Sequence, residues 1–129
     1  MTVSGLKEAL HLTAFALPQG ERDVRGGYAG DLLSWVMGRA QADDAWLTIM
    51  SNPNIVAVAT LTDVSCIILC EAVAPDAGVV DLAAQKGINL LGSESSAFSL
   101  SAQISLLLSA RIAAICTFTP ASRPVRRRT

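Results

Sequence analysis

The feature that most constrains the fold of this chain is a series of short apolar runs separated by segments with a helical pattern. Ser65–Leu69 is a continuous run of mostly β-branched and aliphatic residues, as expected of a parallel strand that is covered on both faces. Ala45–Met50 and Ile88–Leu91 are buried-strand candidates of the same kind. Strands that alternate with helices of about ten residues predict a parallel sheet with right-handed crossovers. We therefore expect an α/β fold, a three-layer sandwich with a mostly parallel sheet flanked by helices.

Four helical segments complete this alternation. Their expected spans are Asp31 to Gly38 or to the polar residues 41–44, then Pro53–Thr62, Ala77–Lys86, and Ala97 to Leu108. Asp31 and Ser96 are suited to cap the first and last of these helices through their side-chain oxygens. Gly87 is suited to close the third, because glycine readily adopts the left-handed conformation found just after a helix.

The segment Ile55–Leu61 allows two interpretations. Its composition is rich in β-forming residues, and Ser51–Asn54 could then be a hairpin loop. However, Asn52 followed by Pro53 is also an N-cap followed by proline at the first helical position, where its fixed φ favours the helix. We predict a helix over Pro53–Thr62.

Shorter elements are expected at both ends of the alternation. Ser4 can cap a short amphipathic helix. Leu12–Leu17 indicates a strand that ends at the turn-forming residues 18–20, and Glu21–Val24 indicates a second short strand. Near the other end, Ile112–Phe118 has the composition of a last edge strand.

Length and charge predict one domain with a tail. The 129 residues are enough for a single domain with a substantial core, and we assign it to residues 1–118 and a disordered basic tail to residues 119–129. The tail carries Arg123, Arg126, Arg127 and Arg128, so the rest of the chain has six basic and eleven acidic residues, a balance of −5. An acidic body argues against nucleic-acid binding, which needs clustered Lys and Arg. The tail could contact an acidic surface, but a solvated tail is the simpler interpretation.

The cysteines and the apolar segments indicate the cellular compartment in which the chain is expected. Cys66, Cys70 and Cys116 lie in apolar stretches, and three thiols cannot complete a four-cysteine zinc or iron–sulfur site. We predict no metal, no cofactor and a reducing, cytoplasmic location. No signal peptide is expected, because the N-terminus lacks a basic region followed by an apolar one. Ala97–Phe118 is the most apolar window, but its serines and Arg111 argue against a membrane span.

Residues 23–31 concentrate the polar and backbone-special residues of the chain. Gly26 and Gly27 can adopt positive φ and expose their N–H groups just before a helix, a combination that binds anions. Arg25 would neutralise the anion, but Asp23 and Asp31 bracket the segment with negative charge. The alternative is a tight strand-to-helix turn in which Asp31 is only a cap. The residue pattern alone favours this turn.

No catalytic set can be recognised. Gly87 and Gly92 have the spacing of a nucleotide phosphate-binding loop, but Ser93 stands where its lysine is required. His11 is the only histidine, and without a clear partner it is expected at the surface or half-buried. No nucleophile elbow is present. In parallel sheets, ligands usually bind beyond the carboxyl ends of the strands, so a site is expected at the loops 50–54, 70–75 and 92–96.

The residues from Gly20 to Leu108 resemble the signature of stand-alone DRTGG-domain proteins. The matching segments are Asp23–Tyr28, Asp31–Ser34, Val36–Met37, Trp46–Ile49, Asn54–Ala59, Ile67–Ile68, Gly87–Ile88, Leu90–Leu91 and Ser96–Phe98. In two places the chain departs from the family pattern: Asn52 stands where many relatives have His, and Trp35 replaces a commonly acidic residue. The first departure weakens a proton-transfer or metal role, and the second adds apolar surface to an exposed helix face.

The resemblance implies a fold and a class of function. The family is related to the N-terminal, non-catalytic domain of HPr kinase/phosphorylase, and to modules beside CBS domains in some inorganic pyrophosphatases and in phosphotransacetylases. It implies an α/β module that associates with itself and has a regulatory role. Stand-alone members are often encoded near iron-only hydrogenase or related redox genes in anaerobic bacteria. Some are labelled serine kinases, which this chain does not support, because the phosphate loop of the kinase is missing.

The leading hypothesis is a non-catalytic regulatory, ligand-sensing or scaffold module that forms a homodimer and binds a small anionic or nucleotide-like ligand. Its candidate ligand-binding residues are Asp23, Arg25, Gly26, Gly27, Tyr28, Asp31, Asn52 and Asn54. Tyr28 would stack on the ligand or hydrogen-bond to it. A second hypothesis is a pure interaction protein whose partner is a redox enzyme. A third is a small enzyme with an unrecognised site.

Overall fold

The computed structural model describes the backbone of residues 1–115 and the side chains of residues 1–110. Its elements are α1 (Val3–Leu10), β1 (Thr13–Ala16), β2 (Gly26–Ala29), α2 (Leu33–Arg39), β3 (Asp44–Thr48), α3 (Asn54–Thr62), β4 (Cys66–Leu69), α4 (Val79–Lys86), β5 (Leu90–Gly92) and α5 (Ala97–Ile115). The five strands form one sheet in the order β1-β5-β4-β3-β2. Strands β2 to β5 are parallel, and β1 is antiparallel to β5. The predicted mostly parallel α/β sheet is confirmed.

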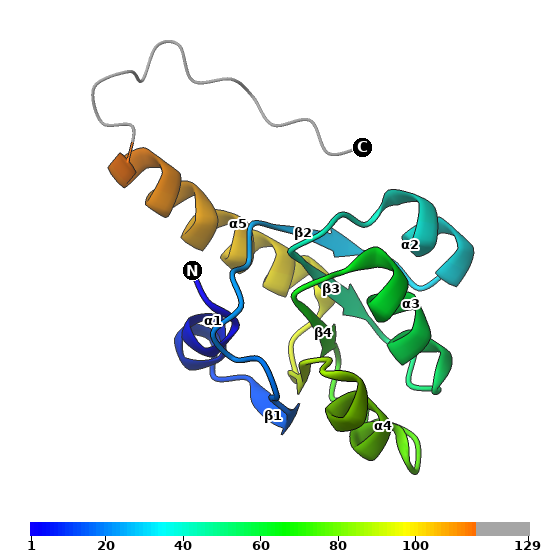
Figure 1. Ribbon diagram of the computed structural model, residues 1–129. Helices are drawn as coiled ribbons and strands as arrows, with labels where there is room; N and C mark the ends of the chain where they lie inside the picture. The colour runs from blue at the N-terminus through cyan, green and yellow to red at the C-terminus, as the bar shows by residue number, and fades with distance from the viewer. Residues whose placement is uncertain (116–129) are drawn as a thin grey trace.

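Helices cover both faces of the sheet and give three layers (Figure 1). One core cluster joins α2, α3 and α4 to the face that carries Trp46, Ile67, Leu69 and Leu90. The other cluster joins α1 and α5 to the opposite face, through Val3, Leu6, Leu100 and Ile104 among others. Successive strand residues alternate between the clusters, because side chains in a strand point to opposite faces. Both faces of β4 are therefore buried, and its run Cys66–Leu69 is apolar throughout.

The parallel strands follow one another across the sheet without reversing direction. Chain order β2, β3, β4, β5 is also spatial order, and the three connecting helices α2, α3 and α4 belong to the same core cluster. A crevice at the carboxyl ends of the strands opens where the strand order reverses. The four parallel strands contain no such point, so the topology supplies no crevice between them.

Most of the predicted elements are present within one to three residues of their expected bounds. Helix α3 occupies residues 54–62, as predicted for Pro53–Thr62 and against the hairpin alternative. Gly87 closes α4 at a φ of 71°. The Ser96 side chain accepts a hydrogen bond from the Ser99 N–H (3.2 Å) at the start of α5. At α1, however, Thr2 and not Ser4 is the N-cap, with its hydroxyl 3.0 Å from the Gly5 N–H.

The second strand was predicted in the wrong place. Residues 21–24 contribute only an isolated bridge between Asp23 and Thr2, while Gly26 and Gly27 begin β2 itself. Neither glycine has a positive φ. The pair is therefore not the joint of a strand-to-helix turn. Two backbone hydrogen bonds at the borders of β2, Arg25 N–H to Asp43 C=O (2.9 Å) and Gly30 N–H to Leu47 C=O (3.0 Å), hold it to β3.

The last element also differs from its prediction. Helix α5 continues to Ile115, so the strand expected at Ile112–Phe118 is wrong over residues 112–115. Residues 116–118 and the tail predicted over 119–129 lie outside the described residues. Within residues 1–115, no helix combines the length and the apolar character needed to cross a bilayer.

Candidate functional site

A groove runs between the strand β2 and the helix α5. Its volume is about 220 Å³, and it is lined by Arg25, Gly26, Gly27, Tyr28 and Ala29 from the strand side, by Leu47, and by Ser101, Ile104, Ser105, Leu108 and Ser109 from α5. Figure 1 shows α5 lying along the face of the sheet at β2 and β3. The groove therefore lies beside the outer strand of the sheet.

The glycines of β2 explain why the groove is open. In the parallel register Gly27 is opposite Ala45, and Ala29 is opposite Leu47. Ala45 and Leu47 belong to the core cluster beneath α5, so Gly27 and Ala29 face the helix as well. At β3 this face is filled by side chains, whereas at β2 it presents a hydrogen atom and a methyl group. Helix α5 packs more closely on β2 than on β3, and the small side chains of β2 leave the space that forms the groove.

Arg25 stands at one end of the groove. Its side chain is 74 % exposed, and its Nε is 3.7 Å from Asp43 Oδ2. The other oxygen, Asp43 Oδ1, is 3.1 Å from Arg22, which also binds Asp63 Oδ1 at 2.9 Å. Arg22 is the better buried and more tightly paired of the two cations. Arg25 is held loosely, so its guanidinium can turn toward a group in the groove at low cost.

The α5 side of the groove combines hydroxyl and apolar groups. Ser101, Ser105 and Ser109 are exposed and follow one another at intervals of four residues, so they lie along one face of the helix. Ile104 is buried, and Leu108 is partly buried against the core. The groove can therefore accept a ligand with an apolar body, hydroxyl or carbonyl groups along one side and an anionic group near Arg25.

Tyr28 belongs mainly to the other face of the sheet. It packs against the core cluster that contains Trp46, as expected because it alternates with Gly27 and Ala29. A Cβ atom on Gly30 would lie 2.9 Å from Tyr28 Cε2, so the glycine makes room for the ring. The Gly30 carbonyl accepts a hydrogen bond from Trp46 Nε1 (2.9 Å). Tyr28 is thus tied to the structure of the β2–β3 pair.

Asp31 joins two strand ends and does not cap α2. Its Oδ1 accepts hydrogen bonds from the Thr48 hydroxyl (2.8 Å) and from the Ile49 N–H (2.9 Å). The N-cap of α2 is Leu32, which makes no side-chain capping bond. The prediction of Asp31 as a cap is therefore wrong: its carboxylate reaches across to β3, where it meets two donors.

The remaining candidate residues lie outside the groove lining. Asn52 Oδ1 accepts a hydrogen bond from the Asn54 N–H (2.9 Å) at the start of α3. Asp23 contributes its backbone, whose carbonyl accepts a hydrogen bond from the Ser65 hydroxyl. The structure thus brings Arg25, Gly26, Gly27 and Tyr28 together along the groove, and places Asp23, Asp31, Asn52 and Asn54 elsewhere.

Sequence reasoning missed the α5 residues of the groove. The signal that could have found them is the helical spacing of Ser101, Ser105 and Ser109 beside Ile104 and Leu108, which marks the border between the exposed and the buried faces of the helix. The expected loops 50–54, 70–75 and 92–96 carry two carboxylates, Glu71 and Glu94, and no basic residue, and Asp31 and Asp76 lie near the same edge of the sheet. That edge disfavours an anion.

The two described cysteines are poor nucleophiles. Burial raises the pKa of the Cys66 thiol to about 12. Burial also raises the pKa of the Cys70 thiol to about 11, and the nearby carboxylates of Asp31 and Glu71 act in the same direction. Both are neutral thiols at physiological pH.

His11 ends α1 as an exposed C-cap residue. The described side chains contain no cluster of three or more His, Cys, Asp or Glu suited to a metal.

Comparison with known proteins gives a structural likeness. No protein-family model matches the sequence, and no curated protein matches it. The structure resembles the crystal structure of the CBS and DRTGG domains of the regulatory region of Clostridium perfringens pyrophosphatase, complexed with its activator diadenosine tetraphosphate. The two share 14% sequence identity at a TM-score of 0.64, over 80% of this chain and 45% of that chain. The likeness shows the fold. This chain corresponds to less than half the length of its neighbour.

Proposed function

We propose that this chain is a non-catalytic regulatory module that senses a small anionic, nucleotide-like ligand in the groove between β2 and α5. One observation carries the proposal. Three neighbouring residues that the sequence singles out as anion-binding candidates, Arg25, Gly26 and Gly27, line a single hollow with a loosely held guanidinium beside it. The likeness to a regulatory region that was crystallised with a dinucleotide activator supports a nucleotide as the class of ligand.

The size of the groove limits how much of the ligand it can hold. Its volume of about 220 Å³ is below the roughly 300–1,000 Å³ of pockets for drug-sized ligands. It suits a phosphate with its attached sugar, or one base, and the rest of a larger ligand would extend into solvent. Arg25 would bind the phosphate, the α5 hydroxyls would bind the sugar, and Ile104 and Leu108 would contact the apolar part.

Calorimetric titration of phosphate, adenosine monophosphate and diadenosine tetraphosphate tests the proposal. We expect saturable binding that is lost in Gly27→Val. A Cβ atom at Gly27 points into the groove and meets the Ala45 carbonyl at an ordinary 3.5 Å, so the strand should accept valine while the groove is filled. Arg25→Gln should weaken the phosphate-bearing ligands at least tenfold, and Lys86→Gln, which removes the same charge from exposed α4, should not. Absence of binding and an unchanged melting temperature at millimolar ligand would refute a sensing role.

The finer parts of the proposal concern assembly and setting. We propose that the module works as a homodimer in the bacterial cytoplasm, in connection with redox or hydrogenase metabolism, as the DRTGG resemblance implies. Gene neighbourhood tests the metabolic link. The absence of redox genes beside this gene would argue against it.

A second candidate function is protein–protein interaction with a redox enzyme. The observation that favours it is the exposed surface of α2, where Trp35 is 54 % exposed. This function predicts co-purification with a partner and loss of the complex in Trp35→Ala, while Gly27→Val has no effect. Tyr28→Ala is a weaker test, because Tyr28 also packs against the core.

A further inference from the structure

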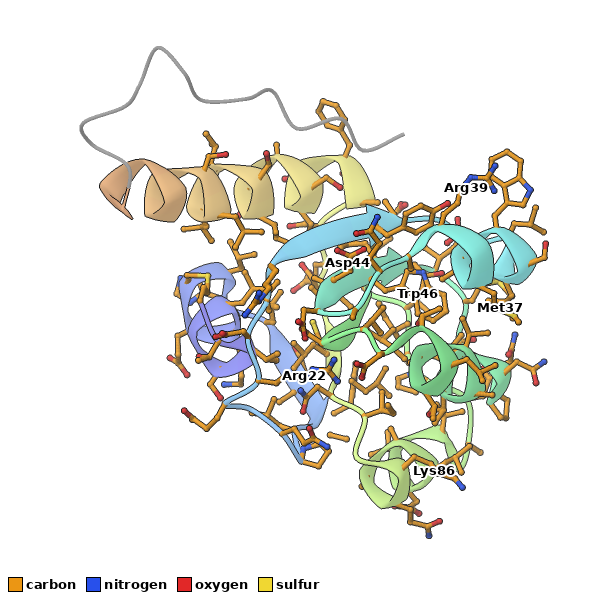
Figure 2. All side chains as sticks on the ribbon, turned by 45° about the horizontal axis from the view of Figure 1, so that its top comes forward. Arg22, Met37, Arg39, Asp44, Trp46 and Lys86 are labelled. Atoms are coloured by element: carbon orange, nitrogen blue, oxygen red, sulfur yellow. The ribbon has the colours of Figure 1, made fainter. Side chains whose placement is uncertain are left out.

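The helix α2 presents an unusual amount of apolar surface for its length. Leu32, Trp35 and Met37 are 59 %, 54 % and 51 % exposed, although the helix has seven residues and only Val36 is fully buried. Arg39 stacks on Trp35, with its Cζ 3.8 Å from the ring centroid. Figure 2 shows Arg39 pointing away from the molecule beyond α2. Trp, Met and Arg are the residues enriched at protein interfaces.

Small residues lie beside this tryptophan. Helical spacing places Ser34 and Gly38 one turn apart on the side of α2 opposite the buried Val36, and both are exposed. A Cβ atom on Gly38 would meet nothing within 4 Å, and its φ is not positive. The fold of the described chain therefore has no need of glycine at this position, where glycine lowers helix stability relative to alanine. A glycine that is free of internal constraints on an exposed helix face permits close approach from outside.

The two ends of this surface carry opposite charges. Asp31 precedes α2 and Arg39 ends it, so the two charges lie at opposite ends of this surface. Both hydrogen bonds that the Asp31 carboxylate accepts from the described residues use Oδ1. The second oxygen has no such bond among the described residues and can accept one from a guanidinium.

We infer that the α2 face, made of Asp31, Leu32, Ser34, Trp35, Gly38 and Arg39, is the surface on which a second copy of this chain docks. The inference rests on the proposed homodimer. When two α2 helices meet in antiparallel fashion about a two-fold axis, Trp35 of each copy packs over Ser34 and Gly38 of the other. Arg39 of each copy then lies beside Asp31 of the other. The two-fold axis thus produces two Arg39–Asp31 pairs, and the antiparallel dipoles of the two helices attract each other as well.

The test is the oligomeric state across a wide protein concentration range, measured by sedimentation equilibrium. We expect a dimer whose dissociation constant rises at least tenfold in Gly38→Gln and in Trp35→Ala. Matched controls are Ala84→Gln, which adds the same side chain to an exposed position of α4, and Phe98→Ala, which removes an aromatic ring that is 86 % exposed on α5. Neither control should change the dissociation constant.

Two further measurements separate the interface from a general loss of structure. The melting temperature of dilute, monomeric Gly38→Gln should not fall, because the added side chain enters open space. Arg39→Glu should weaken the dimer, and added salt should weaken the dimer of the unaltered chain. A chain that stays monomeric at the highest concentration would overturn the inference, as would a dimer unaffected by both α2 variants. Capture of a different protein through Trp35 by a monomeric chain would also overturn it.

The groove and the interface can fail independently. The α2 residues do not line the groove, so the α2 variants should bind phosphate and nucleotides as the unaltered chain does. Loss of dimerisation with intact ligand binding would confirm the interface alone. A stable dimer with no ligand binding would leave the interface in place and refute the sensing role.

Discussion

The Asp31 carboxylate and the Thr48 hydroxyl are 2.8 Å apart and join the carboxyl ends of β2 and β3. The same carboxylate oxygen accepts the Ile49 N–H at 2.9 Å, and the Thr48 hydroxyl accepts the Met50 N–H at 3.1 Å. Within the described residues, β2 is an edge strand with β3 as its one neighbour. These side-chain bonds therefore reinforce a strand that backbone pairing holds from one side only, at the point where the chain leaves the sheet for α2.

Replacing Asp31 by alanine should lower the free energy of unfolding by about 1.5–3 kcal/mol, because hydrogen bonds to a charged group are lost. Urea denaturation with linear extrapolation measures the change. Glu94→Ala is the control, since Glu94 is an exposed carboxylate of the same polar edge. Equal stabilities of the two variants would show that the Asp31 contacts contribute nothing to folding.

The buried cysteines predict how stability and thiol reactivity depend on pH. Burial raises the pKa of Cys66 to about 12 and that of Cys70 to about 11, from an ordinary value of 9.0. Unfolded thiols ionise first, so this contribution to stability is complete below pH 9 and is lost as the pH rises through 11 to 12. In a Cys116→Ser background, neither thiol should react with a thiol reagent at pH 8 without denaturant. Rapid labelling of a native thiol would contradict the assigned burial.

The structure also predicts opposite effects of alanine at two glycines. Gly87 ends α4 at a φ of 71°, and a Cβ atom there would lie 2.8 Å from Gln19 Nε2. The Gln19 amide can move aside, but the left-handed backbone costs alanine about 1 kcal/mol. Gly38→Ala should instead stabilise the monomer by up to about 1 kcal/mol through helix propensity. Thermal unfolding of dilute protein should separate the two variants in opposite directions from the unaltered chain.

The sequence correctly predicted those elements whose secondary structure follows from the composition of their own residues. Cys66–Leu69 is buried on both faces, so its composition alone indicates a central strand. At β2 the composition misleads, because Gly26 and Gly27 have no intrinsic preference for a strand. The two glycines form a strand because they pair with β3 along the backbone, and this long-range pairing cannot be seen in the local sequence. In α5 the aliphatic run from Ile112 favoured a strand, yet no helix-breaking residue separates it from the helix that Ser96 starts.

The β2 side of the groove could be predicted from the sequence, whereas the α5 side could not. Arg25 to Tyr28 are adjacent in sequence, so their grouping was visible before the structure. The other wall of the groove belongs to α5, more than seventy residues later in the chain. Its position follows from the packing of Leu100 and Ile104 on the β3 face. Only the tertiary structure shows that the small side chains of β2 lie under the α5 serines.

The last prediction concerns Asn89, which joins three segments at the amino ends of β4 and β5. The residue is 1 % exposed. Its Nδ2 donates to the carbonyls of Gln19 (2.8 Å) and Ser65 (2.9 Å), and its Oδ1 accepts the Gln19 N–H (2.9 Å). Asn89→Ala should lower the free energy of unfolding by about 2–4 kcal/mol, because it creates a small cavity and leaves buried backbone groups without partners.

Asn89→Asp should be the more damaging change at neutral pH, although it preserves the shape of the side chain. A buried carboxylate would face two carbonyl oxygens with no proton to donate, so burial and these acceptors would both raise its pKa. A raised pKa means that the native state binds the proton more tightly than the unfolded state, so stability should increase as the pH falls toward 4. Urea denaturation of both variants at pH 7 and pH 4.5 distinguishes the two mechanisms. Asn89→Asp should recover relative to Asn89→Ala at the lower pH. A constant difference between them would show that Nδ2 of Asn89 is not the donor to both carbonyls.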